Sequence, residues 1–393
     1  MEHATPILVS LGLVLYGLVS RRLSAGVITA PIVFVLFGLL GGPGAHVLAL
    51  PMDHAFVHVL AEATLILVLF ADASRIDLRV LRRDLGVPVR LLGIGLPLTI
   101  AAGAVVAHLM FPDLTLWECA TLAAVLAPTD AALGQAVVSS PSVPLALRQS
   151  LSVESGLNDG IALPAVLLFG CLASDSDLGS GYWVQFALTQ IGFGPLVGIA
   201  VGALGGLSLA WANGRGWVDP PMQRVSALAL AFLAYALAEG IGGNGFIAAF
   251  VAGAAFGYTA KEALHPVHEF LEAEGSLLML FVFLLFGAEL AYPAAAEATP
   301  AVWIYVALSL TVIRMLPVAL SVMGAKLPAR DVLFLGWFGP RGLATILFGL
   351  LILDRTRMPH VEFIAQVAMA AALASVFAHG LTAAPAVRRY DAA

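Results

Sequence analysis

The sequence has little charge and almost no cysteine, and both shortages limit what the protein can be. Charged residues make up 11% of the 393 residues, against the roughly 25% that is usual in soluble domains. Hydrophobic residues make up 60% and form long runs along the whole chain. This composition argues against a water-soluble domain and predicts an all-α integral membrane protein.

Three further absences narrow the possible functions. The net charge of −6 is spread along short loops without a basic patch, so nucleic acid is not an expected partner. Cys119 and Cys171 lie in apolar segments and form neither a disulfide framework nor a metal pattern. The start of the chain lacks the basic region of a secretory signal, so we expect the first apolar run to be retained as a span.

Apolar runs of about 20 residues can cross a bilayer as helices. The chain contains thirteen such runs, which predict one transmembrane transporter unit over residues 1–393, in contact with the lipid bilayer and without a soluble regulatory domain. The predicted spans are residues 6–20, 24–41, 55–72, 87–110, 115–138, 147–173, 185–212, 222–240, 244–259, 267–291, 300–323, 331–353 and 362–386.

Lysine and arginine predict the orientation of these spans, because cytoplasmic loops collect them. With the N-terminus outside, two of the nineteen basic residues, Arg355 and Arg357, fall in outside loops, and Arg314 and Arg341 lie within spans. A miscount by one span would mix the two sides, so we expect the C-terminus to be cytoplasmic. The inside residues are Arg21, Arg22, Arg75, Arg79, Arg82, Arg83, Arg90, Arg148, Arg215, Arg224, Lys261, Lys326, Arg330, Arg388 and Arg389.

Proline and glycine cluster in the middle of two predicted spans. The segment 115–138 contains Ala127-Pro128-Thr129-Asp130, and the segment 331–353 contains Gly339-Pro340-Arg341-Gly342. Proline has no backbone donor, and in a bilayer such interruptions persist where they are packed in protein or line a polar cavity. Interrupted helices in corresponding positions of two halves are the best sequence indication of a transporter's binding site.

The two interruptions do occupy corresponding positions. The spans from 24–41 to 147–173 and the spans from 244–259 to 362–386 form two five-helix units of opposite topology, each interrupted in its fourth helix. The sequence therefore predicts inverted repeats. The ends of the half-helices carry partial charges, so we expect Asp130 to balance the positive N-ends and Arg341 the negative C-ends.

A polar cluster follows in the span 147–173, where ionisable groups are costly and usually functional. At 100° per residue, Ser155 and Asp159 lie about 40° apart on one helix face, and Glu154 and Asn158 share a neighbouring face. Carboxylate and hydroxyl oxygens are suitable ligands for a dehydrated Na⁺ or Li⁺. Thr129 and Asp130 of the interrupted span 115–138 are candidates to complete the shell.

Asp159 can hold a proton or a cation, because burial favours a neutral carboxylate and a bound cation favours the ionised one. That competition is the chemistry of an antiporter. Glu154, if ionised, needs a cationic partner, for which Arg314 and Arg341 are the candidates. Asp72 ends the span 55–72 and either guides cations at the cytoplasmic mouth or is a surface charge beside Arg75.

These residues resemble the monovalent cation/proton antiporters, specifically the NhaP-like sodium/proton exchanger branch. The resemblance covers essentially the whole transmembrane unit. The motifs that carry it are Ala127-Pro128-Thr129-Asp130, Glu154-Ser155-x-x-Asn158-Asp159, Arg314-x-x-Pro317 and Gly339-Pro340-Arg341-Gly342.

The resemblance implies that Asp159 binds both ions, assisted by Thr129, Asp130 and Ser155, and that Glu154 pairs with Arg314. Asn158 resembles the electroneutral branch, since electrogenic relatives carry a second aspartate and a membrane lysine there. Relatives form homodimers, in which a core domain moves against a dimer domain. For this chain the core is expected at about 87–173 and part of 267–386, with the remaining spans as scaffold.

The sequence thus predicts a transporter rather than an enzyme, with no cofactor: an electroneutral Na⁺ or Li⁺/H⁺ antiporter that serves pH homeostasis in the cell membrane. K⁺/H⁺ exchange and cation-coupled solute transport remain open alternatives on the same fold. An ion channel would not need paired interruptions in inverted units. An intramembrane hydrolase is disfavoured, because His108 has no nearby serine or cysteine in a recognisable arrangement.

Overall fold

The protein is described here by a computed structural model that covers residues 4–24, 27–44, 54–76, 86–130, 133–174, 180–260 and 265–391. All regular structure within these ranges is helical. Nine of the described helices are long and apolar enough to cross a membrane, and four shorter apolar helices accompany them. The predicted all-α membrane class is therefore confirmed.

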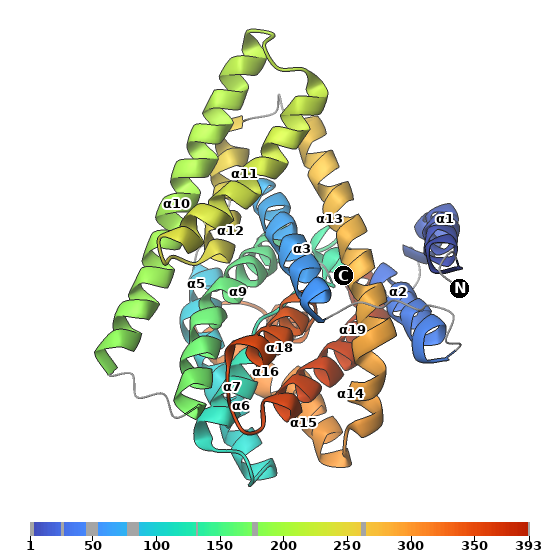
Figure 1. Cartoon of the computed structure of the whole chain (residues 1–393), viewed down its shortest axis with the longest axis vertical. Coiled ribbons are helices and arrows are strands. Elements are labelled where there is room, and N and C mark those ends of the chain that lie inside the picture. Colours follow the sequence, from blue (N-terminus) through green and yellow to red (C-terminus); the bar gives the residue numbers. More distant parts are fainter. Residues whose placement is uncertain are drawn as a thin grey trace.

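Figure 1 shows the described helices coloured in chain order. In chain order they are α1 (Ala4–Ser24), α2 (Ala30–Leu39), η1 (Leu40–Gly44), α3 (His54–Ser74), α5 (Gly86–Arg90), η2 (Leu91–Gly95), α6 (Leu96–Met110), α7 (Leu116–Leu126), α8 (Gln135–Val138), α9 (Leu145–Ala173), α10 (Ser180–Gly214), α11 (Pro220–Gly240), α12 (Gly245–Ala260), α13 (His265–Leu285), η4 (Phe286–Leu290), α14 (Ala291–Glu297), α15 (Pro300–Leu310), α16 (Val312–Ser321), α17 (Ala329–Trp337), α18 (Leu343–Arg355) and α19 (Val361–Asp391).

The chain leaves the α-helical conformation at the two predicted interruptions. The helix α7 ends at Leu126 and α8 begins at Gln135, while α17 ends at Trp337 and α18 begins at Leu343. One irregularity is absent from the sequence prediction: the segment 300–323 divides at Thr311, whose φ of −116° and ψ of −98° are not helical. Single π-helical turns also occur within two segments that we predicted to be regular, as η2 and η4, and a third, η1, follows α2.

Three helices pack into a layer through glycine. A methyl group added to Gly194 or Gly198 of α10 would lie 2.8 Å or 2.6 Å from a carbonyl oxygen of Asn244 or Ala248. On the opposite side of α12, Gly253 touches the backbone of α3 in the same way. Glycine at four-residue spacing lies on one helix face, so these backbones approach as closely as helices can. We call α3, α10 and α12 the glycine layer.

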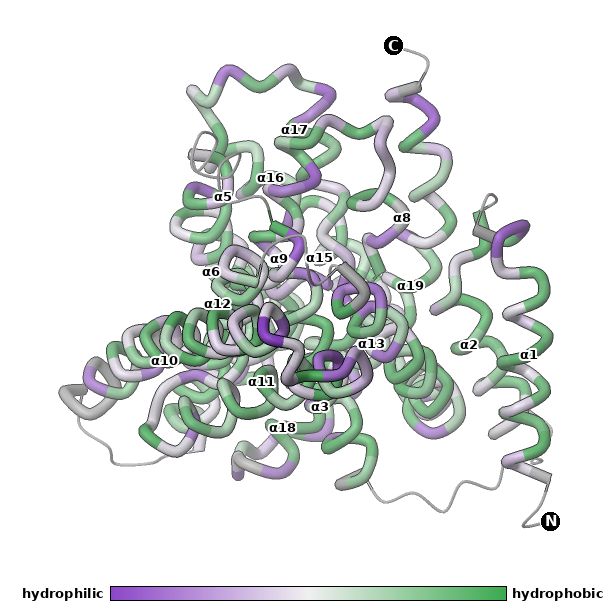
Figure 2. Tube along the Cα trace, turned by 90° about the horizontal axis from the view of Figure 1, so that it is seen from above, coloured by the Kyte–Doolittle hydropathy of each residue, from purple (hydrophilic) through white to green (hydrophobic). Residues whose placement is uncertain are grey.

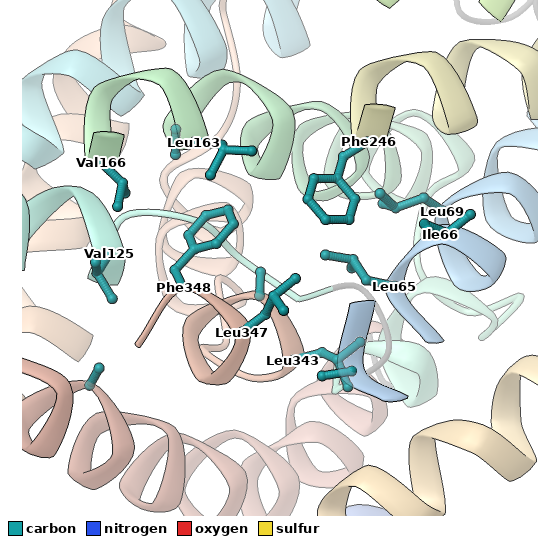
Figure 3. Packing of buried hydrophobic residues seen from close by; sticks show 14 of the residues in the cluster. Leu65, Ile66, Leu69, Val125, Leu163, Val166, Phe246, Leu343, Leu347 and Phe348 are labelled. Carbon is teal, nitrogen blue, oxygen red and sulfur yellow. The ribbon is translucent and has the colours of Figure 1, made fainter. Parts of the chain in front are cut away.

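The half-helix α18 packs against both α3 of this layer and α19. Apolar side chains of five helices gather where they meet (Figure 3), and they include Leu65, Ile66, Leu69, Val125, Leu163, Val166, Phe246, Leu343, Leu347 and Phe348. Outward faces are apolar as well: Leu18 on α1 is 78% exposed and Leu204 on α10 is 65% exposed. Hydrophilic residues gather at helix ends and loops (Figure 2). This distribution is that of a protein whose solvent is lipid.

Candidate ion-binding site

The two interruptions cross each other through a backbone hydrogen bond. The amide nitrogen of Asp130 donates to the carbonyl oxygen of Pro340 at 2.7 Å. Residues 127–130, 133–134 and 338–342 lie between the half-helices, so both segments carry backbone groups that no helix satisfies. At the crossing these groups find partners in the opposite chain segment.

Each crossing segment also supplies a charge to the other segment's half-helix. The Asp130 carboxylate accepts a hydrogen bond of 2.6 Å from the amide of Leu343, the first residue of α18. The Arg341 guanidinium donates to the carbonyl oxygens of Ala127 at 2.5 Å and Pro128 at 2.9 Å, where α7 ends. A carboxylate thus lies at a positive helix N-terminus and a guanidinium at a negative C-terminus, which is the favourable arrangement at both.

Glycine at the second interruption is required by the closeness of this crossing. A methyl group on Gly339 would lie 2.5 Å from Nε of Arg314 and 2.9 Å from the methyl carbon of Thr129. A methyl group on Gly342 would overlap the carboxylate of Asp130. Any larger residue at either position would push the two segments apart and break the bonds that join them.

The hydroxyl group of Thr129 connects the crossing to α9. The side-chain amide of Asn158 donates to the Thr129 hydroxyl oxygen at 2.7 Å, and the Ser155 hydroxyl lies 3.0 Å from the same oxygen. These three residues and Asp159 are at most 5% exposed. Thr129, Ser155 and Asn158 therefore form one buried polar cluster that spans two helices.

Two oxygen atoms at this cluster lack donors. Within the described part of the chain, no donor reaches Oδ1 of Asp159 or Oδ1 of Asn158. A buried oxygen without a partner costs free energy, so such groups in native proteins call for an explanation. The unpartnered oxygens of these two consecutive residues, and the hydroxyl groups of Thr129 and Ser155, are of the kind that binds a small cation.

A buried ion pair lies one turn away. Oε1 of Glu154 is 2.6 Å from Nη1 of Arg314, and both side chains are at most 2% exposed. The sequence left Arg314 and Arg341 as alternative partners, and the structure pairs Glu154 with Arg314, which leaves Arg341 to the carbonyl groups of α7. Arg314 lies in the first turn of α16, three residues after the irregular residue Thr311.

Sequence reasoning did not single out Ser375 and His379 of α19. The amide of Arg341 donates to the Ser375 hydroxyl at 2.6 Å, and His379 lies 3.0 Å from both that hydroxyl and the carbonyl oxygen of Trp337. These residues satisfy backbone groups freed by the second interruption. His379 lies well inside a predicted span, as His108 does, so the presence of a buried histidine was the available signal.

Asp72 lines a cavity next to the first interruption. The cavity has a volume of about 240 Å³, and its polar lining includes Asp72, Arg75, Gln135, Arg148 and Ser152. An ion pair of 2.9 Å between Arg75 and Glu272 stands nearby. Arg79, Arg82, Arg83 and Lys261, which we assigned to inside loops, lie outside the described residues. Lys326 lies between α16 and α17, outside the helices.

Two helices interrupted at a shared buried crossing, each neutralised by a charge from the other, define a class of membrane protein: the ion-coupled secondary transporters. The particular family follows from comparison. The chain belongs to the sodium/hydrogen exchanger family, whose model of the transmembrane region matches residues 8–389. This is a family of antiporters rather than enzymes.

The relatives share low sequence identity with this chain but match long segments of it. The chain is 29% identical to the Na(+)/H(+) antiporter 2 of Zygosaccharomyces rouxii over 257 residues, which are 61% of this chain and 31% of that protein. It is 24% identical to the K(+)/H(+) antiporter NhaP2 of Shewanella sp. (strain ANA-3), with 95% of this chain and 64% of that protein covered. The chain thus spans less than a third of the length of the first relative and slightly less than two thirds of the second.

The fold also has a counterpart among solved structures. The sodium proton antiporter MjNhaP1 from Methanocaldococcus jannaschii superposes with a TM-score of 0.78, and the match covers 98% of this chain and 97% of that one. At 18% sequence identity, this likeness establishes the fold alone.

Proposed function

We propose that this chain is a Na⁺ (or Li⁺)/H⁺ antiporter in which Asp159 holds the cation and the proton in turn. The observation that carries the proposal is the pair of unpartnered buried oxygens on Asp159 and Asn158. Ser155, Thr129 and Asp130 complete the ligand shell, the first two through hydroxyl groups that already meet at 3.0 Å. Glu154 with Arg314 and Arg341 at the crossing hold the helices that carry these ligands.

The exchange is electroneutral in this proposal. Asp159 is the single carboxylate that alternates between ions, and residue 158 is an asparagine, which cannot ionise. One cation therefore replaces one proton, and each complete cycle moves no net charge. Asp72 lines the cytoplasmic approach, where a carboxylate raises the local concentration of cations.

Alternating access requires that the site move relative to a frame. We propose thirteen transmembrane spans in two inverted five-helix repeats, with the N-terminus outside the cell membrane and the C-terminus in the cytoplasm. A core of about residues 87–173 and part of 267–386 carries the site, and the remaining spans form a scaffold through which two copies of the chain dimerise. The glycine layer supports this division, because its helices are too tightly packed to slide past one another.

K⁺ is the second candidate cargo. The relative that covers 95% of this chain is named a K(+)/H(+) antiporter, whereas the yeast relative is named a Na(+)/H(+) antiporter. Cation-coupled transport of an organic solute is less well supported, because the polar cluster at Asp159 offers few hydrogen-bonding groups beyond one cation shell.

The test is exchange in sealed liposomes that contain a pH dye and an acidic interior. Na⁺, Li⁺ or K⁺ is added outside to the wild type, to Asp159→Asn and to the matched control Asp113→Asn, whose carboxylate is exposed in the loop after α6. We expect Na⁺ and Li⁺ to dissipate the gradient with the wild type and the control, and Asp159→Asn to be inactive.

A valinomycin clamp, with K⁺ on both sides, tests the stoichiometry. Electroneutral exchange of Na⁺ keeps the same rate under the clamp, whereas electrogenic exchange accelerates. Activity in Asp159→Asn would refute the site, and a strong effect of the clamp would refute the stoichiometry. A response to K⁺ alone, measured without valinomycin, would show that the transported cation is K⁺ and would not contradict the assignment of the site to Asp159.

A further inference from the structure

The helix that carries Asp159 has a gap in its own hydrogen bonds. Pro164 lies inside α9, and it has no amide hydrogen to donate to the carbonyl oxygen four residues earlier. That carbonyl belongs to Gly160, the residue directly after Asp159. The missing hydrogen bond of α9 thus lies at the residue next to the proposed ion-binding residue. The freed carbonyl group is buried and requires another donor.

Asn244 supplies the missing hydrogen bond from a different helix. Its side-chain nitrogen donates to the carbonyl oxygen of Gly160 at 3.0 Å. Asn244 is fully buried and directly precedes α12. One side-chain amide from the glycine layer therefore takes the place of the hydrogen bond that Pro164 removes from α9.

The orientation of the Asn244 amide is determined by its other contacts. Its side-chain oxygen accepts a hydrogen bond of 3.0 Å from the amide of Ile247. Through this bond, Asn244 caps the first turn of α12. Its backbone amide donates to the carbonyl oxygen of Gln190 on α10 at 3.1 Å. Because the oxygen is taken by a donor and the backbone is anchored, the nitrogen must face Gly160.

The close approach of α9 to α12 makes this contact possible. A methyl group on Gly160 would lie 3.2 Å from the backbone nitrogen of Ile247 and would overlap the Ile247 side chain. A methyl group on Gly156, one turn earlier, would overlap the ring of Phe250. Both glycines flank Asp159 in sequence, so α9 touches the layer at the turn that carries the proposed site.

We propose that Asn244 is a positioning residue for Asp159 and a latch between the ion-binding helix and the glycine layer. This inference rests on the proposed function. The bond to Gly160 holds the backbone directly after Asp159, and with it the carboxylate to which we assign the cation. Movement of α9 past α12 must break the bond, so the bond favours the conformation of this structure.

Pro164 makes the proposal testable by a double-mutant cycle. Asn244→Ser keeps an oxygen that can cap Ile247 but loses the amide nitrogen that reaches Gly160, because the serine side chain is one atom shorter. Pro164→Ala restores the helical donor, so that Gly160 no longer depends on Asn244. Wild type, both single variants and the double variant are compared by their half-saturating Na⁺ concentration in liposomes and by their unfolding temperature in detergent.

We expect Asn244→Ser to raise the half-saturating Na⁺ concentration about fivefold, the effect of one lost hydrogen bond, and to raise it less than twofold in the Pro164→Ala background. The unfolding temperature is expected to show the same rescue. Rescue of unfolding without any change in Na⁺ concentration would overturn the positioning role and leave only a structural bond. Additive effects in both measurements would overturn the whole inference.

Failure of the proposed function is distinguishable from failure of this inference. If the wild type exchanges K⁺ alone, the cycle is measured with K⁺, and the same outcomes decide it. If Pro164→Ala by itself removes exchange, the cation-dependent rise in unfolding temperature of the four proteins replaces the half-saturating concentration. Equal rises in all four would then refute the positioning role.

Discussion

The glycine layer and the crossing of the interrupted helices are built on opposite principles. In the layer, α10 and α12 pack backbone to backbone through Gly194 and Gly198, where the absence of side chains lets the two helices approach. At the crossing, proline and glycine leave backbone groups open, and Asp130 and Arg341 of the opposite segment satisfy them. In a membrane protein, glycine thus allows helices to pack rigidly, whereas an interrupted helix exposes polar backbone groups that can bind charged side chains.

The difference separates stability from chemistry. The layer is held by backbone contacts at its glycines, and Asn244 beside α12 reaches Gly160, so the layer suits a fixed frame. The crossing concentrates charge in a place with little water, where each pairing is strong and each unpaired atom is available to a ligand. Substitutions in the two regions should therefore fail in different ways, and the following predictions test that contrast in order of decreasing effect.

The largest effect is expected from Glu154→Gln. This change leaves Arg314 as a buried charge without its counter-ion and should lower the free energy of unfolding by about 3–5 kcal/mol. Thermal unfolding in detergent measures it. The double variant Glu154→Gln/Arg314→Met removes both charges and should recover part of the loss. A single variant as stable as the wild type would show that the pair does not hold the helices.

A smaller loss is expected in the glycine layer from Gly198→Ala. The added methyl group would lie 2.6 Å from the Ala248 carbonyl oxygen, and separating the helices should cost about 1–3 kcal/mol. Gly192→Ala on the same helix is the matched control, because nothing lies within 4 Å of the added group. The control should be neutral or slightly stabilising. Equal unfolding temperatures for the two variants would contradict the tight packing of the layer.

The pH dependence of transport distinguishes the regions by mechanism. If Asp159 holds either ion, the proton competes with the cation, so lower pH must raise the half-saturating Na⁺ concentration. Where Asp159 is protonated in most molecules, each fall of one pH unit should raise the half-saturating Na⁺ concentration about tenfold. Initial rates at several pH values give the slope. Gly198→Ala should shift the stability and leave this slope unchanged, and a flat slope in the wild type would exclude direct competition.

The smallest effect is expected from Asp72→Asn. The cavity that Asp72 lines also contains Arg75 and Arg148, so its loss changes the local field only modestly. We expect the half-saturating Na⁺ concentration to rise about twofold at low ionic strength and the effect to fade as salt is added. Asp113→Asn serves again as the control. An effect of Asp72→Asn that persists in high salt would place this carboxylate in the ion site itself.

Local chemistry explains why several features could be read from the sequence. Proline weakens a helix, and Pro128 and Pro340 marked both interruptions because a charged residue stands close to each, whereas Pro164 lies inside the continuous helix α9. The polar cluster of α9 stood out because ionisable residues are rare in apolar runs. The division at Thr311 and the π-helical turns were missed, because neither leaves a comparable signal in composition.

Contacts between residues on different helices could not be predicted from the sequence in the same way. Glu154 had two arginine candidates, and helical spacing alone does not choose between elements that are far apart in the chain. Asn244 carried no signal either, since it stands at the start of a span and its partner is a backbone carbonyl. Pro164 was visible in the sequence, but the donor that replaces its missing hydrogen bond was not.

The sequence by itself determined the membrane class, the family and the positions of the two interruptions, because hydrophobicity, proline and glycine act within a few residues of where they stand. Only the tertiary structure decided that Asp130 meets α18, that Arg341 meets α7, that Glu154 meets Arg314 and that Asn244 meets Gly160. Asp130 and Leu343 are 213 positions apart in the chain. Contacts at such separations depend on how whole helices pack, and packing is a property of the assembled molecule.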